Sequence, residues 1–438
     1  MQPLYVELSF SNASLVVKVN ETVLPVSERA EMTLFLDQSG WLTARVPGRF
    51  ESGVNPYVQI DLLTTGETPG AVISSDTYGL LPFYYAILAD GSFALTNDIL
   101  KLRRKLSSVQ LDEQAFYELV RFGHCYGTKT LIKSIYRLPA LFNLSVSSSG
   151  MRFSTTEKKR SFPTYVTEKP EKALDRPAID RVHQAFQQSL KSITGDIVVS
   201  LSSGFDSRYV VATLAESGRR FTTFTTHWPV NDNYDADIAR YVSSALRVPN
   251  YFSPLQNDFM YHWAEKKLEL VNYETTMHDW LVGPIMSAPW RGASHIDGLA
   301  GDIIVRASNI DEGLHTYPAA NAWKGFIGHM LRGMTMNDTG ALFAKEADEL
   351  FGNRVLEEVH GQLETVGRHI GAATHIFMFN RIRRAISPAF YGIYSNRFSN
   401  FSPFLSEEFL DATMSIAPAQ RKTLYARLFE RFPKLAEI

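Results

Sequence analysis

A short polar loop at residues 202–207 carries the residues best suited to chemistry. The sequence Ser202-Ser-Gly-Phe-Asp-Ser207 follows the apolar run Ile197-Val-Val-Ser-Leu201 and precedes a helical pattern that opens at Arg208. A strand, a small-residue loop and a helix N-terminus in this order gather backbone N–H groups at one point, and such a point attracts phosphate. The loop lies at the carboxyl end of a predicted parallel strand, where ligands bind in such folds. We therefore expect Leu201, Ser202, Ser203, Gly204 and Ser207 to contact the phosphates.

Asp206 is the unusual member of this loop. A carboxylate repels a polyphosphate unless a cation lies between them, so we interpret Asp206 as a Mg²⁺ ligand. The alternative is an ordinary serine-rich turn in which Asp206 only caps the following helix.

Composition limits the classes of function. The chain has 438 residues, which predicts two or three domains. With 44 Lys and Arg against 46 Asp and Glu, there is no electrostatic reason to expect nucleic acid or a charged membrane as a partner. Without a signal-like start or a long apolar stretch, we expect a cytoplasmic protein.

Cys125 is the single cysteine of the sequence, so a disulfide framework and a thiolate-rich zinc site are excluded. It follows His124, but neighbours in sequence rarely face each other as a catalytic pair must. We therefore expect a buried or incidental thiol rather than a nucleophile.

The elements around the loop predict an α/β protein with two domains. Residues 1–155 form a β-rich unit of short strands with a helix over 111–121, and residues 175–438 form the second domain, separated by a linker rich in Lys, Glu, Thr and Pro. In the second domain, strands near 197–201 and 221–226 alternate with helices near 177–190, 208–216 and 235–246. This order favours a parallel sheet covered by helices, and the chain from about 319 onward is mostly helical.

At the loop the chain resembles the asparagine synthetase superfamily, whose ATP pyrophosphatase loop has the sequence Ser-Gly-Gly-Xaa-Asp-Ser. Ser203 stands where the family usually has glycine. The family's second strand, whose end contacts adenine, is similar to Phe221–Thr226, which implies that Thr225 contacts ATP. The segment 295–303 is similar to the family's Gly-Xaa-Gly-Xaa-Asp-Glu loop, which implies that Gly301 contacts ATP and that Asp302 is the second Mg²⁺ ligand.

The resemblance extends toward both ends of the chain. Ser402-Pro-Phe-Leu405 is similar to the family's Pro-Phe-Leu-Asp, with Ser406 in place of the acid. The segment 421–424 is similar to Lys-Xaa-Leu-Leu, which implies that Lys422 binds the phosphates and assists catalysis. Segments 76–85, 97–100 and 135–139 look like the glutaminase domain of the same family. The fold implied is a glutaminase-like N-terminal domain plus an adenine nucleotide α-hydrolase-like domain with a helical C-terminal part.

This resemblance implies an enzyme that uses ATP and Mg²⁺ to convert a carboxylate into an adenylate, which an amine then attacks with release of AMP and pyrophosphate. Every group in that transition state is an anion, so Mg²⁺ on Asp206 and Asp302 and the Lys422 ammonium would offset the charge. Considered singly, Asp302 could equally be a turn residue and Lys422 a solvated helix residue.

The N-terminal domain departs from the family. Glutamine-dependent members have a nucleophilic cysteine as residue 2, whereas this chain has Gln2, so glutamine hydrolysis by that mechanism is excluded. The domain would then be a retained structural partner. Superfamily members whose substrate supplies its own amine share this departure. The chain looks most like β-lactam synthetases of antibiotic biosynthesis, with lasso peptide cyclases second and an ammonia-dependent amidotransferase third.

Other positions differ from the β-lactam synthetase pattern. β-Lactam synthetases have a catalytic tyrosine where this chain has Leu299. They also have a later catalytic lysine, so either Lys434 substitutes for it, the sequence is a shortened form, or the cyclisation chemistry is handled differently. Ser203, Leu299 and Ser406 also motivate a rival of another class, a binding protein that has lost catalysis.

The substrate pocket is expected between the second and third strands of the sheet. Tyr273, Glu274, His278 and Asp279 lie there, and Glu274 or His278 could act as a general base. An ordinary polar loop is the alternative. A predicted helix carries Arg381, Arg383 and Arg384, which could bind a carboxylate of the substrate. The alternative is that they form a basic face exposed to solvent. The expected partners are an amino-acid-like small molecule or a peptide, and a second copy in a homodimer.

Overall fold

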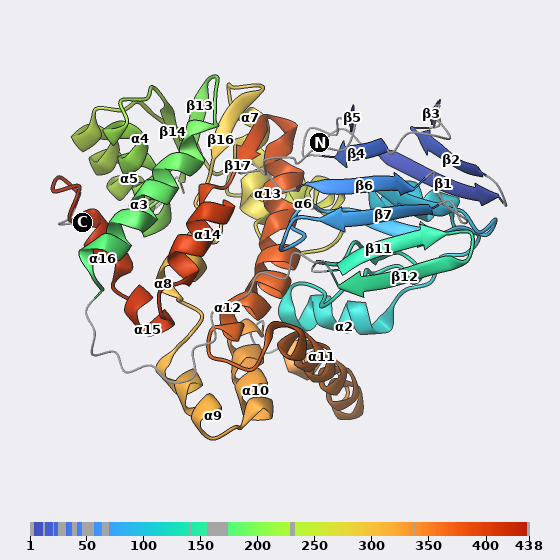
Figure 1. Ribbon diagram of the computed structural model, residues 1–438. Helices are drawn as coiled ribbons and strands as arrows, with labels where there is room; N and C mark the ends of the chain where they lie inside the picture. The colour runs from blue at the N-terminus through green and yellow to red at the C-terminus, as the bar shows by residue number, and fades with distance from the viewer. Residues whose placement is uncertain are drawn as a thin grey trace.

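The computed structural model describes residues 4–11, 14–20, 22–24, 32–36, 42–45, 57–63, 70–140, 142–155, 174–227, 233–335 and 339–435. Two layers of antiparallel strands from the N-terminal half lie beside a parallel sheet and its helices, as Figure 1 shows. This arrangement confirms the predicted α/β class: antiparallel sheets first, then a parallel sheet with helices, then a helical C-terminal part.

The N-terminal half contains two six-stranded antiparallel sheets among the described residues, ordered β10-β8-β9-β1-β2-β3 and β12-β11-β7-β6-β4-β5. Alternate residues of these strands, such as Val6, Leu8, Ile60 and Ile73, are buried, because one face of each sheet packs on the core. The strands are β1 (Tyr5–Ser11), β2 (Ser14–Val19), β3 (Thr22–Leu24), β4 (Met32–Leu36), β5 (Leu42–Arg45), β6 (Val58–Leu63), β7 (Gly70–Ser75), β8 (Tyr84–Ile87), β9 (Phe93–Thr96), β10 (Tyr136–Arg137), β11 (Phe142–Ser147) and β12 (Gly150–Thr155).

Two helices complete this half, α1 (Ile99–Lys105) and α2 (Glu113–Phe122). The predicted helix near 111–121 is α2. Asp112 accepts a hydrogen bond from the Ala115 N–H at its start, and Gly123, with φ of 76°, ends it. Strand β12 ends at Thr155 and the next helix begins at Arg176, so the predicted linker between them lies outside the described residues and the domain boundary stays a prediction.

The second half is built on a five-stranded parallel sheet ordered β15-β14-β13-β16-β17. Central strand β13 begins with three buried apolar residues, Ile197, Val198 and Val199, as is typical of a parallel strand covered on both faces. The strands are β13 (Ile197–Ser200), β14 (Thr222–His227), β15 (Asn250–Pro254), β16 (Ala293–Ile296) and β17 (Phe398–Phe401). The helices beside them are α3 (Arg176–Lys191), α4 (Phe205–Glu216), α5 (Tyr234–Leu246), α6 (Phe259–Leu270), η1 (Asp279–Leu281), α7 (Val282–Ser287) and α8 (Gly301–Arg306).

The remainder is mostly helical, as predicted, apart from edge strand β17. Its helices are η2 (Glu312–His315), α9 (Thr316–Ala319), α10 (Trp323–Met334), η3 (Thr339–Leu342), α11 (Lys345–Val366), α12 (Ala372–Phe377), the π-helix η4 (Met378–Ile386), α13 (Ser387–Ile393), η5 (Tyr394–Asn396), η6 (Pro403–Leu405), α14 (Glu407–Met414), α15 (Pro418–Arg421) and α16 (Leu424–Phe429).

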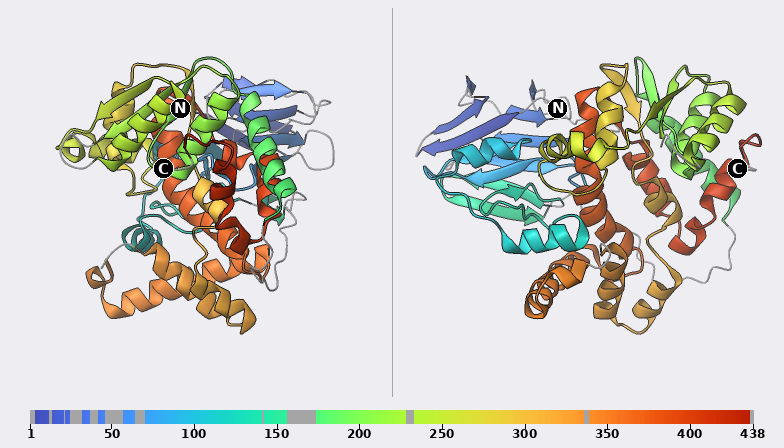
Figure 2. Two further views of the ribbon diagram at one scale, coloured as in Figure 1. Left: turned by 90° about the vertical axis from the view of Figure 1, so that its left-hand side faces the viewer. Right: turned by 180° about the vertical axis from the view of Figure 1, so that it is seen from behind.

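One continuous apolar core joins the two halves, because its buried members run from Leu4 to Leu435. The column formed by α12, η4 and α13 runs between the antiparallel sheets and the parallel sheet in both Figure 1 and Figure 2. A second core packs α2 against α10, α11 and α12. None of the described helices is both long enough and apolar enough to span a bilayer.

Candidate active site

A cavity of ≈ 270 Å³ opens at the carboxyl edge of the parallel sheet. It lies where β13, β14 and β16 end, which is the edge at which ligands bind in open parallel sheets. The loop after β13 contributes Leu201, Ser202, Gly204, Asp206 and Ser207 to its wall, and the other lining residues are Ser200, Phe224, Thr226, Asp235, Trp280, Asp297, Gly298 and Tyr394.

The loop is held by its own hydroxyl groups. Ser207 Oγ accepts from the Ser202 N–H at 3.1 Å, and Ser202 Oγ accepts from the Gly204 N–H at 3.2 Å. Helix α4 begins at Phe205 with Gly204 as its N-cap, so Asp206 and Ser207 lie in its first turn. The prediction that this helix opens at Arg208 was therefore three residues late. The first-turn N–H groups have no acceptor within the helix and are available to a phosphate.

The structure brings Asp206 and Asp302 together. The Asp302 N–H donates to Asp206 Oδ2 at 2.9 Å, and the Tyr425 hydroxyl donates to Asp206 Oδ1 at 2.5 Å. Two glycines make room for the Asp206 side chain, because a Cβ on Gly298 would lie 2.7 Å from its Cβ and a Cβ on Gly301 would lie 2.6 Å from its Cγ. Gly301 thus packs against the carboxylate and does not line the cavity.

Without a cation, the ionised carboxylate of Asp206 is electrostatically unfavourable. Burial, and next the negative charge of Asp302, raise the pKa of its carboxyl from 3.8 to about 7. Two adjoining carboxylates of this kind suit Mg²⁺, which is commonly held by one or two carboxylates plus water and substrate phosphates. Among the residues described, no cluster of three or more His, Cys, Asp or Glu side chains could bind a metal ion, so a cation here would also need phosphate oxygens.

A third acid in the cavity was missed by the sequence reasoning. Asp297 follows β16 directly, and burial raises the pKa of its carboxyl to about 6. The signal was its position in front of Gly298 at the end of a strand, the same context that singled out the loop after β13. Tyr425, Trp280 and Tyr394 were also missed, and their positions depend on tertiary packing.

Two predicted nucleotide contacts, Thr225 and Ser203, are not among the residues that line the cavity. Thr225 is buried and its hydroxyl donates to the Leu201 carbonyl at 2.9 Å, while its neighbours Phe224 and Thr226 line the cavity. Successive side chains of a strand face opposite sides, so the Thr225 side chain does not face the cavity, and its contact with ATP stays a prediction. The Ser203 hydroxyl donates to Asp235 Oδ1 at 2.5 Å and ties the loop to the start of α5.

Lys422 lies at the opposite end of α8 from Asp302. Its ammonium donates to the Ala307 carbonyl at 3.0 Å and to the Ile310 carbonyl, and burial lowers its pKa. Within the described residues it forms no ion pair with either aspartate. Its contact with phosphate stays a prediction. Lys434 is exposed on the final turn.

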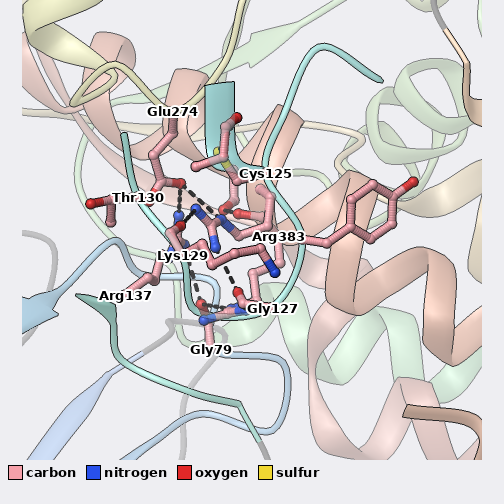
Figure 3. A network of polar contacts seen from close by, with 12 residues as sticks. Gly79, Cys125, Gly127, Lys129, Thr130, Arg137, Glu274 and Arg383 are labelled. Carbon is pink, nitrogen blue, oxygen red and sulfur yellow. Dashed lines mark hydrogen bonds and ion pairs between the residues drawn. The ribbon is translucent and has the colours of Figure 1, made fainter. Parts of the chain in front are cut away.

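Glu274 belongs to the boundary between the two halves, shown in Figure 3. Its carboxylate accepts from Arg137, lies 3.4 Å from Arg384 Nε, and is 2% exposed. It is not among the residues that line the cavity, and two guanidinium groups lie beside it. The geometry therefore corrects the prediction that Glu274 acts as a general base, because a buried carboxylate paired in this way has a structural role.

Arg383 and Arg384 also belong to this boundary. Arg383 donates to the Leu138 carbonyl at 2.6 Å and to the Gly127 carbonyl at 3.1 Å, while Arg384 donates to the Gly127 carbonyl at 2.6 Å. Both are buried, so neither the substrate role nor the solvated face applies to them. Cys125 is buried in the same region, where burial raises its pKa to about 12, which confirms the expectation of an unreactive thiol.

His278 lies near the cavity without lining it. Its ring centre is 6.5 Å from that of Trp280, which does line it. Burial, and next the charge of Lys267, lower its pKa to about 4. The ring is therefore neutral at pH 7, and its role as a base stays a prediction. The nearby Asp279 forms an ion pair with Lys267 at 2.8 Å.

A second cavity, of ≈ 710 Å³, lies on the other side of the paired aspartates. Asp302 lines it, together with side chains from the loop after α8, from α10 and from η4. Arg381 is among them, so one of the three predicted arginines does face a cavity. Nothing in the sequence pattern distinguished Arg381 from its two neighbours.

Residues 181–271 match the family model described as asparagine synthase. The matched segment contains the 202–207 loop with Asp206, and strands β13 to β15. No curated protein matches the chain. Among solved structures, NMN synthetase from Francisella tularensis is similar at 10% identity and a TM-score of 0.21, covering 44% of this chain and 96% of that one.

Proposed function

We propose that this chain is an ATP- and Mg²⁺-dependent synthetase that adenylates a substrate carboxylate and joins it to an amine. The observation that carries the proposal is the contact of Asp206 with Asp302, in which the Asp302 N–H donates to the Asp206 carboxylate at the edge of the first cavity. The asparagine synthase match over residues 181–271 supports ATP-dependent amide chemistry.

The proposed roles follow from the geometry of the first cavity. The first turn of α4 and the hydroxyls of Ser202 and Ser207 would face the phosphates, and Asp206 and Asp302 would hold Mg²⁺, which would supply positive charge against the pyrophosphate. The substrate carboxylate attacks the α-phosphorus as the bond to pyrophosphate breaks. An amine then attacks the acyl carbon and AMP departs with the bonding electrons. Holding both reactants in adjoining cavities supplies much of the rate through proximity.

The size of the second cavity favours a small substrate over a peptide. A volume of ≈ 710 Å³ falls within the range of about 300–1,000 Å³ for small-molecule sites. This supports an intramolecular or small-molecule reaction of the β-lactam synthetase type, in specialised metabolism, over a lasso peptide cyclase.

The test is ATP–pyrophosphate exchange with hydroxylamine trapping, using amino acids that carry a second carboxylate. The expected result is AMP, pyrophosphate and a hydroxamate in equal amounts, lost in Asp206→Asn and Asp302→Asn and kept in Asp237→Asn. Formation of ADP would refute adenylation. ATP binding without any exchange across the panel would favour the rival binding protein.

A further inference from the structure

The second cavity has a wall of charged side chains that the first cavity does not use. Of the two aspartates, Asp302 lines the second cavity and Asp206 does not. The polar residues that carry the argument are Asn309, Asp311, His329, Arg332 and Arg381.

Two arginines on this wall suit an anion. Arg332 belongs to α10 and Arg381 to η4, and in the part of the chain that the structure describes neither forms an ion pair. Arg381 is half-buried, with its guanidinium carbon 6.0 Å from the centre of the Phe377 ring. Guanidinium groups bind carboxylates in a planar geometry with two hydrogen bonds. Two guanidinium groups beside a cavity, neither of them in an ion pair within the described residues, therefore suit a carboxylate ligand.

The two ring nitrogens of His329 have different partners. Its Nε2 lies 2.7 Å from Asp311 Oδ2, and its Nδ1 lies 3.5 Å from the Tyr317 hydroxyl. A carboxylate only accepts hydrogen bonds, so Nε2 carries the proton and Nδ1 keeps its lone pair. The Tyr317 contact is at the limit of a hydrogen bond and leaves that lone pair available. Asp311 would stabilise the imidazolium that forms when Nδ1 takes up a proton.

The chain makes space for this histidine. A Cβ on Gly313 would lie 2.8 Å from His329 Cε1, and a Cβ on Gly325 would lie 2.6 Å from Tyr317 Cε1. Side chains at these two positions would displace the rings. The absence of a side chain at both therefore permits the arrangement of Asp311, His329 and Tyr317.

Asn309 adds an unsatisfied amide to the same wall. Its Oδ1 and Nδ2 are both buried, and neither has a hydrogen-bond partner among the described residues. Buried polar atoms normally have partners, so these two atoms call for a ligand with one donor and one acceptor. An amine and a carboxylate together meet that requirement.

We propose that the second cavity binds an amino acid with an additional carboxylate, that Arg332 and Arg381 hold this carboxylate, and that His329 is the catalytic base for the attacking amine. The proposal rests on the proposed function. The amine lone pair forms the new C–N bond, the acyl C–O bond to AMP breaks with its electrons leaving on the phosphate, and the amine proton passes to His329 Nδ1. Asp311 is a positioning residue that orients the ring.

Binding is tested first, with L-glutamate as the probe and the full chain in the presence of a non-hydrolysable ATP analogue and Mg²⁺. The expected result by calorimetry is saturable uptake that weakens at least tenfold in Arg332→Gln and in Arg381→Gln. Arg354→Gln is the matched control, because Arg354 also lies over a phenylalanine ring, at 5.8 Å from Phe351, but on α11 outside the cavity. Absence of uptake, or equal uptake in all variants, would overturn the proposed ligand.

Catalysis is tested by comparing hydroxamate formation with amide formation in His329→Ala. Hydroxylamine is unprotonated near neutral pH and needs no base, so hydroxamate formation reports adenylation alone. The expected result is an unchanged hydroxamate rate, an amide rate at least a hundredfold lower, and partial rescue by imidazole. His360→Ala is the control, since it removes an exposed histidine–carboxylate pair at 3.6 Å on α11.

The outcomes separate the two proposals. Loss of hydroxamate in the wild type contradicts the proposed function itself. Normal hydroxamate with an undiminished amide rate in His329→Ala contradicts only the role of His329. A reduced amide rate that imidazole does not restore assigns His329 a structural role and also overturns the inference.

Discussion

Replacing Asp206 with asparagine should stabilise the metal-free protein and remove its response to ATP. The pKa of this carboxyl is raised from 3.8 to about 7 by burial and then by Asp302, so its ionised form opposes folding. A shift of about three units at about 1.4 kcal/mol per unit sets an upper limit of about 4 kcal/mol. Asp206 is half-buried, and solvent screening reduces the effect to about 1–2 kcal/mol at pH 8.

The sign depends on pH. A carboxyl whose pKa is raised by folding destabilises fully above about pH 7 and not at all below its ordinary pKa of 3.8. The advantage of Asp206→Asn should therefore shrink as the pH falls from 7 toward 4. The asparagine can keep the bond from the Asp302 N–H and donate to the Tyr425 oxygen, so no hydrogen bond need be lost.

Adding ATP and Mg²⁺ should reverse the order of stability. A ligand at 100 times its Kd stabilises the wild type by about 2.7 kcal/mol, and the variant should gain little because it lacks one anionic ligand for the cation. Urea unfolding at pH 8 and pH 6, followed by tryptophan fluorescence, measures both effects.

The matched control is Asp237→Asn, an aspartate 69% exposed in an ion pair with Arg240. It should change the unfolding free energy by less than about 1 kcal/mol and keep the ATP response. A metal-free Asp206→Asn protein less stable than the wild type at pH 8, or one with an intact ATP response, would refute the reasoning.

Three further predictions concern packing and buried charge. Glu274→Gln leaves Arg137 and Arg384 without their counter-charge and should cost about 3–5 kcal/mol in urea unfolding, against less than about 1 kcal/mol for the exposed Glu269→Gln. Gly301→Ala forces Asp206 aside and should lower the unfolding free energy by about 1–3 kcal/mol and abolish the ATP response in thermal-shift assays, whereas Gly361→Ala on α11, with open space at its Cα, should do neither. His295 is fully buried and its pKa is lowered from 6.5 to about 3, so the unfolded chain takes up a proton that the folded chain refuses, and stability falls as the pH drops below 6.5. His295→Gln should reduce that loss between pH 6.5 and 5 by up to about 2 kcal/mol, and an unchanged pH slope would contradict the assignment.

Local patterns were sufficient to predict most elements and the loop. Strand β13 and the loop after it could be predicted because an unbroken apolar run followed by small polar residues has few other structures available. The start of α4 was placed late because Gly204 adopts an extended N-cap conformation, with φ of −66° and ψ of 147°, that the sequence alone does not reveal.

Residues whose roles depend on distant partners could not be predicted. Tyr425 reaches Asp206 across 219 positions, and Glu274 meets Arg137 across 137 positions, so neither pairing leaves a local signal. For Thr225 the limit is the orientation of its side chain. A shift of one residue moves a strand side chain to the opposite face, and the sequence did not fix which threonine of β14 faced the cavity.

The N-terminal half has a structural connection to the second cavity. The π-helix η4 carries Arg381 on the cavity wall, and only two and three residues later Arg383 and Arg384 donate to backbone carbonyls of the N-terminal half. These anchors lie on the same short π-helix as Arg381, and π-helical winding is often found at functional sites. Glu274 adds the counter-charge, since it joins Arg384 to Arg137 at the same boundary. The N-terminal half is therefore connected, through η4, to the wall of the second cavity that we propose binds the substrate.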